Sequence, residues 1–149
     1  FSIDGVVQTA SSFKPMYFNR KELNAWIALS IYNSNLFNYW WVALSDGRNV
    51  TNKEVDSILL PQSLHTEELL VELAKALMED LQQNSTIVTY NKAKGVTSYA
   101  QFIPRLSKHI IDEIDGVLAR HYGFTEEELD FIINYDIKYR MGDELNGDE

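Results

Sequence analysis

The stretch from Thr66 to Asn84 has the clearest periodicity in the chain and does most to limit its possible folds. Its apolar side chains recur at helical spacing, so they lie on one face over about four turns. These side chains are Leu69, Leu70, Leu73, Ala76, Leu77 and Leu81. Glu67 and Glu68 stand where a helix dipole favours acidic residues, and Asn84 tolerates the left-handed conformation of a helix end. The sequence predicts a helix here.

Two helices are predicted before this one. Asn19 followed by Glu22 resembles a capping box, and apolar residues at helical spacing follow, which predicts a helix over about 20–32. An Asn-Ser pair then interrupts the pattern. The apolar run 36–44 has no clean period, and we favour a second buried helix over a strand.

Two more helices are predicted near the end. Pro104 fits the first position of a helix that continues to Gly123, a residue suited to a helix end. Thr125 and Glu128 form a capping box for the next helix. We expect these two helices to pack as a pair.

Short β-hairpins complete the expected fold. Asp4-Gly5 favours a tight turn between apolar residues, and 86–103 alternates around a Lys/Gly turn. Thr51 or Asn52 is expected to cap a one-turn helix, followed by a short strand that ends at Pro61. The predicted fold class is α+β and mainly helical.

Size and composition suggest one compact domain. The 149 residues are 45% apolar and include no cysteine, which suits a cytoplasmic protein, and no segment is apolar enough for a membrane. The chain begins at Phe1 without a methionine, so we expect a fragment of a larger protein. We assign 1–65 to one part, 66–142 to a helical part packed on it, and 143–149 to an acidic disordered tail.

The net charge of −9 is unevenly distributed. Residues 1–60 carry five basic and five acidic side chains, whereas 61–149 carry eight basic and seventeen acidic ones. An acidic chain is a poor free-standing DNA binder, so any nucleic-acid role must be local or shared. No acidic residue occurs between Asp80 and Asp112. That window contains the basic residues Lys92, Lys94, Arg105 and Lys108.

Catalytic motifs are absent from the sequence. There is no phosphate-binding glycine loop, HExxH motif, nucleophile elbow or cysteine. The histidines at 65, 109 and 121 stand far apart, so surface or capping roles are favoured over a metal site. Asp136 and Lys138 suggest the acidic-x-Lys ending of a metal-dependent nuclease core. Such a core needs a strand and further acidic residues nearby, whereas the spacing here is helical, so this interpretation is not favoured. The acidic groups near 112–115 and 126–130 are interpreted as caps and solvated faces.

The aromatic residues before the Ser45-Asp46-Gly47 turn allow two interpretations. Trp26, Phe37, Tyr39, Trp40 and Trp41 have side chains that stack on nucleic-acid bases. A base-stacking platform is normally interleaved with Lys and Arg, and none occurs between Lys21 and Arg48. Core packing is therefore favoured.

Two phrases carry a resemblance to a known family. They are LNAWIALSIYNSNLFNYWWVALSDGRNVTNKEV at 23–55 and IIDEIDGVLARHYGFTEEELDFIINYDIKYRMG at 110–142. They resemble the C-terminal, target-recognition region of bacterial adenine-specific DNA methyltransferases of restriction-modification systems, particularly type II restriction enzymes that fuse methylation and cleavage. The family's glycine motif for S-adenosylmethionine and its Asn- or Asp-Pro-Pro-aromatic motif are both missing here. The resemblance implies a DNA-recognition fragment without a cofactor, while the parent binds S-adenosylmethionine and transfers the methyl group.

This resemblance directs attention to the turn that follows the aromatic residues. Arg and Asn side chains read base edges, and Lys contacts phosphates. The expected DNA-binding residues are Lys14, Arg20, Lys21, Ser45, Arg48, Asn49, Asn52 and Lys53. The expected partners are double-stranded DNA, reached through the parent enzyme, and the catalytic methyltransferase domain. The alternative is a structural or interaction module that packs on the catalytic domain or a partner subunit and never touches DNA.

Overall fold

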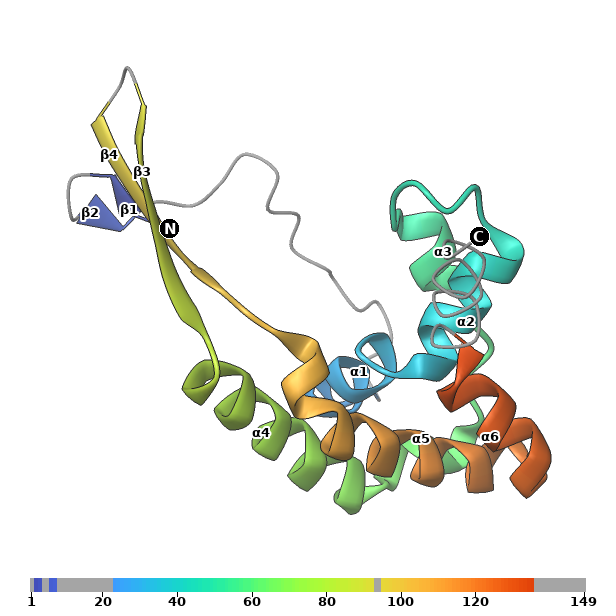
Figure 1. The fold of residues 1–149 in the computed structure, drawn as a ribbon. Helices are drawn as coiled ribbons and strands as arrows, with labels where there is room; N and C mark the ends of the chain where they lie inside the picture. Colours follow the sequence, from blue (N-terminus) through green and yellow to red (C-terminus); the bar gives the residue numbers. More distant parts are fainter. Residues whose placement is uncertain (1, 4–5, 8–22, 93–94, 136–149) are drawn as a thin grey trace, which may run out of the picture.

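The computed structural model describes residues 2–3, 6–7, 23–92 and 95–135. They form six α-helices, two short 3-10 helices and one four-stranded antiparallel sheet (Figure 1). The α+β, mainly helical class predicted from the sequence is therefore confirmed.

Five helices share a single apolar core: α1 (Ala25–Tyr32), α2 (Asn35–Leu44), α4 (Glu68–Gln83), α5 (Lys108–Tyr122) and α6 (Glu126–Ile133). α4 and α5 run side by side, with α1 packed against both, while α2 and α6 pack at the far end of α5 (Figure 1). The most deeply buried core side chains are Ile27, Ile31, Leu64, Leu70, Leu77, Ile114 and Leu118. The core therefore joins residues from both halves of the sequence.

The start of α1 differs from the prediction. Residues 23–24 are not helical, so a helix beginning near Arg20 is wrong. Asn24 is the cap, and its side-chain oxygen accepts a hydrogen bond from the Trp26 N–H at 2.9 Å. Asn24 satisfies a free N–H group of the first turn, which is the role expected for Asn19. Asn19 itself lies outside the described residues.

α4 confirms the predicted helix but corrects its details. Its buried face is formed by Leu70, Leu73, Ala74, Leu77 and Leu81. Leu69 and Ala76, predicted on that face, are exposed instead. Asn84 is not left-handed, because its φ is −91°, and its side-chain amide donates to the Asp80 carbonyl at 3.0 Å. This hydrogen bond from the Asn84 side chain pairs a carbonyl group in the last turn of the helix, which the sequence expected a left-handed residue to do.

Local caps also shape the middle of the chain. α2 begins after Ser34, whose hydroxyl oxygen accepts from the Phe37 N–H at 3.0 Å. The predicted one-turn helix is α3 (Asn52–Ser57), capped by Thr51. The predicted strand ending at Pro61 is wrong, because 58–61 forms no strand and a 3-10 helix, η1 (Gln62–Thr66), follows immediately.

The sheet contains both predicted hairpins. β1 (Ser2–Ile3) pairs with β2 (Val6–Val7), and β3 (Thr86–Lys92) pairs with β4 (Gly95–Gln101), in the order β2-β1-β4-β3. β3 and β4 project from the helical body as a long ribbon, and β1 pairs with β4 along one of its edges (Figure 1). The short helix η2 (Pro104–Ser107) connects the ribbon to α5. This ribbon is the most extended part of the described chain.

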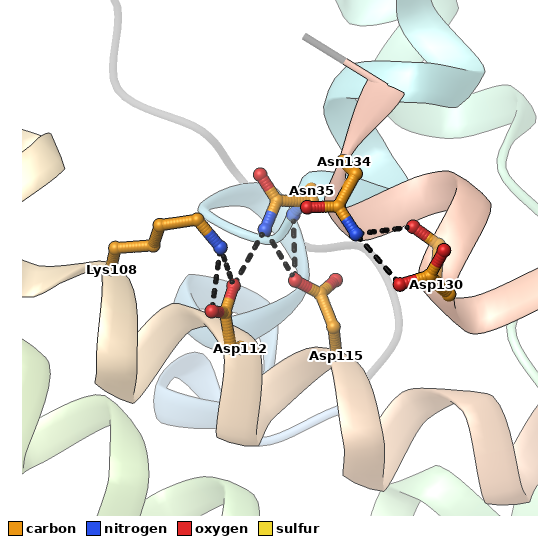
Figure 2. A network of polar contacts seen from close by, with 6 residues as sticks. All are labelled: Asn35, Lys108, Asp112, Asp115, Asp130 and Asn134. Atoms are coloured by element: carbon orange, nitrogen blue, oxygen red, sulfur yellow. Dashed lines mark hydrogen bonds and ion pairs between the residues drawn. The ribbon is translucent and has the colours of Figure 1, made fainter. Parts of the chain in front are cut away.

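A buried carboxylate on α5 holds the start of α2. Asp115 is only 1% exposed. Its carboxylate accepts hydrogen bonds from the Leu36 N–H at 3.0 Å, the Asn35 N–H at 3.2 Å and the Asn35 side-chain amide at 2.8 Å. Asp112, which is bound by the Lys108 ammonium, accepts a longer bond of 3.4 Å from the same amide (Figure 2). Asp115 thus satisfies N–H groups that the first turn of α2 leaves without helical partners.

Burial raises the pKa of Asp115 to about 6, even though the bonds from Leu36 and Asn35 act in the opposite direction. The ordinary aspartate value is 3.8, so the folded protein binds more protons than the unfolded chain between these two values. The stabilisation that this proton binding contributes is fully present below the ordinary value of 3.8. It is lost as the pH rises through about 6.

We predict that Asp115→Asn removes this part of the pH dependence. As the pH rises from about 4 to about 7, the unfolding free energy of wild type minus that of the variant should fall by about 3 kcal/mol, because only wild type carries this carboxyl group. Urea unfolding across this pH range measures it. Asp56→Asn, an exposed matched control on α3, should keep the wild-type profile. Parallel profiles for wild type and Asp115→Asn would show that the assignment to Asp115 is wrong.

Candidate nucleic-acid interface

The turn after α2 is ordered by its own polar side chains. The Ser45 hydroxyl oxygen accepts from the Gly47 N–H, and the Asp46 carboxylate accepts from the Arg48 N–H, both at 3.1 Å. Gly47 has a φ of +68°, in the left-handed region that glycine adopts without steric cost. These local bonds define the turn without help from the apolar core.

Further bonds tie the turn to its two neighbouring helices. The Trp41 indole N–H donates to the Asn49 carbonyl at 3.4 Å, which joins the turn to α2. At α3, the Thr51 hydroxyl accepts from the Lys53 N–H at 3.3 Å, and the Glu54 carboxylate accepts from the Thr51 N–H at 2.8 Å. Thr51 and Glu54 complete the capping box, and hydrogen bonds donated to the Glu54 carboxylate, first by the Thr51 hydroxyl and then by the Thr51 N–H, lower the pKa of Glu54. The backbone from 45 to 54 is therefore held at both ends.

The structure places four of the predicted DNA-binding residues on the surface of this turn. Arg48, Asn49, Asn52 and Lys53 are all exposed. Ser45 is half-buried, and its hydroxyl already bonds within the turn, so it supports the turn's shape. The other three predicted residues, Lys14, Arg20 and Lys21, lie outside the described residues. Their position relative to the turn therefore stays a prediction.

Carboxylates accompany the two cations of the turn. Asp46 lies before Arg48, and Glu54 and Asp56 follow Lys53. Two positive side chains against three negative ones do not make a cationic surface. A nucleic acid at this turn would be contacted through directional hydrogen bonds more than through overall attraction to phosphates.

The aromatic residues behind the turn pack mainly into the protein. Phe37 is buried and stacks on Trp40 at 5.9 Å between ring centroids. Tyr39 and Trp40 are half-buried against the core, as the core interpretation predicts. Trp26 differs, because it lies on the surface with the Lys75 ammonium 6.0 Å from its ring centroid. The rings of α2 therefore brace the turn.

A cluster of polar side chains was not foreseen from the sequence. The Ser63 hydroxyl is hydrogen-bonded to His121 Nδ1 at 2.8 Å, and His121 Nε2 is 2.8 Å from the Glu67 carboxylate. The bond from His121 lowers the pKa of Glu67. Glu67 and Ser63 are 54 and 58 positions from His121 in the chain, so no local motif indicates these contacts.

This cluster has the side-chain types of a hydrolytic triad, but its surroundings favour a structural role. Glu67 also accepts from the Leu69 N–H as the cap of α4. Neither of the two main grooves among the described residues is lined by Ser63. The contacts instead join η1, α4 and α5. Among the described residues, no group of three or more His, Asp or Glu side chains is placed to hold a metal ion.

Two adjoining apolar grooves flank α2. One, of about 570 Å³, lies between α2 and α6; the other, of about 480 Å³, lies between α2, α3 and the end of α5. They share the side chains of Leu36, Trp40, Leu44 and Phe124. Leu44 is 69% exposed, and Leu59, at the edge of the second groove, is 83% exposed. The protein therefore presents an apolar surface close to the turn.

Comparisons with protein-family models, with curated proteins and with solved structures find no match for this chain. Within the described residues, none of the helices combines the length and apolarity needed to cross a membrane.

We predict opposite stability effects for alanine at two glycines. At Gly47, the positive φ strains any larger residue, so Gly47→Ala should lower the unfolding free energy by about 1 kcal/mol. Gly116 lies within α5, where Gly116→Ala should raise the unfolding free energy by about 0.5–1 kcal/mol. A Cβ added at either position has no heavy atom within 4 Å, so crowding does not obscure the comparison. Urea unfolding measures both; equal signs would contradict the conformational argument.

Proposed function

We propose that this chain is a non-catalytic DNA-recognition module of an adenine-specific methyltransferase from a restriction-modification system, acting in the cytoplasm. The observation that carries the proposal is the turn after α2. Its backbone is held by local hydrogen bonds, while Arg48, Asn49, Asn52 and Lys53 extend into solvent. Arginine pairs with guanine, asparagine pairs with adenine, and lysine contacts phosphate. A rigid turn with these side chains suits sequence readout on double-stranded DNA.

The fold supports such readout by limiting movement of the turn. Asp115 holds the first turn of α2, and the rings of Phe37 and Trp40 pack behind its middle. The Trp41 indole then bonds the turn directly. Preorganised contact groups lose less conformational entropy on binding. The acidic charge elsewhere weakens nonspecific attraction to DNA, which makes binding dependent on the parent enzyme.

Chemistry belongs to another part of the parent in this proposal. The sequence lacks the glycine motif that binds S-adenosylmethionine and the Asn- or Asp-Pro-Pro-aromatic motif that positions a flipped adenine. The module selects the site, and the catalytic methyltransferase domain transfers the methyl group. This chain alone should therefore show no methyltransferase activity.

We predict that Arg48→Ala and Lys53→Ala change DNA recognition in the full-length methyltransferase without unfolding it. Loss of a base contact at Arg48 should weaken binding by about 1–3 kcal/mol and relax one position of the recognised site. Loss of a phosphate contact at Lys53 should weaken all sites alike and reduce the salt dependence. Duplex binding at several salt concentrations and mapping of methylated sites measure these effects.

The control for these variants is Arg120→Ala, which removes an exposed cation from the end of α5. It should leave affinity and site choice unchanged. If Arg48→Ala and Lys53→Ala also leave both unchanged, the turn is not the recognition element.

A second candidate function is supported by the grooves beside α2. Apolar grooves between helices accept an apolar helix face from another protein. Here the occupant would be the parent's catalytic methyltransferase domain or a partner subunit, and the chain would act as an interaction module. The exposure of Leu44 and Leu59 favours this candidate, because large exposed apolar patches mark interaction sites.

We predict that Leu44→Ser and Leu59→Ser weaken association with the separately produced catalytic domain at least tenfold if the grooves form that interface. Both side chains are mostly exposed, so the folded chain should retain its stability. Calorimetric titration measures the association, and Leu69→Ser, at an exposed position on α4, is the matched control. Wild-type association for both groove variants would eliminate this interface.

A further inference from the structure

We infer that the outer edge of β3 pairs antiparallel with the same edge of a second copy of this chain, which joins the two sheets about a two-fold axis. The surface is the backbone edge of the strand, and the partner is the chain itself. The inference is independent of the proposed function, because neither the turn after α2 nor the grooves beside that helix form part of this contact.

β3 lies at one end of the sheet and is longer than the strand at the other end. The strand order is β2-β1-β4-β3, so β4 pairs with one edge of β3, and none of the described strands pairs with the other edge. β3 has seven residues, whereas β2 has two. In an antiparallel ladder, alternate residues exchange their backbone hydrogen bonds with the partner strand. The intervening residues of β3 therefore direct N–H and C=O groups toward the outer edge, where a further strand can bind them.

β3 lacks the features by which soluble proteins prevent pairing at a sheet edge. These features include proline, a charge in the middle of the strand, a bulge and a very short strand. β3 has no proline, it pairs with β4 without interruption, and its one charged residue is Lys92 at its end. Its outer surface is also open, since Ile87 is 70% exposed and Thr89 and Asn91 are exposed as well. Another strand can therefore extend the sheet along this whole edge.

The sequence of β3 is complementary to itself in the antiparallel direction. A two-fold axis at Thr89, the middle residue of the strand, places Thr89 opposite its own copy. Val88 then lies opposite Tyr90 of the second copy, and Ile87 lies opposite Asn91. Threonine pairs and pairs of an aromatic with a β-branched residue are among those that stabilise antiparallel sheets. This register brings no two charged residues together and uses all seven residues of the strand.

The distribution of charge favours a second copy at this edge over contacts elsewhere on the chain. The net charge is −9, so two copies repel each other across much of their surface. β3 lies within the stretch between Asp80 and Asp112, which contains no acidic residue. β3 and β4 project from the helical body (Figure 1), and antiparallel pairing directs the two bodies to opposite ends of the joined sheet. The acidic helices therefore stay apart while strands without acidic residues meet.

The contact is small, so the dimer should form reversibly. One strand from each copy buries less surface than the standard interface between stable partners, and interfaces below that size are weak and transient. We therefore expect monomer and dimer to exchange, with the dimer fraction rising as the protein concentration rises.

The first test adds a charge at the centre of the contact. Thr89→Lys places two ammonium groups opposite each other only in the dimer, so it should weaken self-association by at least about tenfold, measured by sedimentation equilibrium. Ala100→Lys is the matched control and should associate like wild type. Ala100 is exposed and lies opposite Ile87, so it shares the face of Thr89 but belongs to β4.

A charge-swap pair tests the register itself. Thr89→Lys and Thr89→Glu should each stay largely monomeric, whereas an equimolar mixture should form a heterodimer, because opposite charges then meet at the axis. Recovered association in the mixture also shows that both variants are folded. A mixture of folded variants that stays monomeric would contradict the pairing at Thr89.

A measurement on the wild-type chain does not depend on any variant. Amide groups on the outer edge of β3 should exchange hydrogen more slowly as the protein concentration rises, while those of α4 should not change. A wild-type chain that stays monomeric up to about 1 mM would overturn the inference. A dimer that Leu44→Ser weakens and Thr89→Lys does not would also overturn it, because the contact would then lie at the grooves. Each of these results leaves the effect of Arg48→Ala on DNA recognition to be decided separately.

Discussion

The arrangement of the candidate site depends on one buried carboxylate. Asp115 on α5 accepts three hydrogen bonds from Asn35 and Leu36 at the start of α2. A charged group in an apolar core is tolerated when several donors surround it, and the remaining desolvation cost is seen in its raised pKa. Because α2 is anchored at its first turn and packed along its middle, the direction in which it presents the turn at its other end is determined. The grooves on either side of α2 follow from the same anchor.

The turn after α2 and the β3–β4 ribbon obtain their shapes from different interactions. The turn combines cations and carboxylates, and its shape comes from bonds between side chains and the nearby backbone. The ribbon has no acidic residue, and its shape comes from the continuous pairing of β3 with β4, to which β1 adds two pairs along the β4 edge. The turn is therefore held locally, whereas the ribbon depends on strands from distant parts of the sequence.

The sequence predicted helix boundaries correctly where the signal was local and strong. The periodicity of α4, the capping box of α6 and the Gly123 end of α5 all predicted real boundaries, because each depends on residues within a few positions. It failed where two local signals competed. Asn19 and Asn24 are both suitable caps, and only Asn24 begins α1. The segment before Pro61 resembles a strand, yet it pairs with none of the described strands and leads into η1.

The sequence by itself determined the mainly helical class, the two hairpins, the turn at Ser45-Asp46-Gly47 and the residue types exposed on it. These features follow from backbone preferences and short-range hydrogen bonds, which a linear pattern records. Only the tertiary structure decided that Asp115 caps a helix some eighty residues away, that Ser63, His121 and Glu67 meet, and that β1 pairs with β4. These contacts depend on how the helices pack around a shared core, and packing joins residues whose positions in the chain carry no mutual signal.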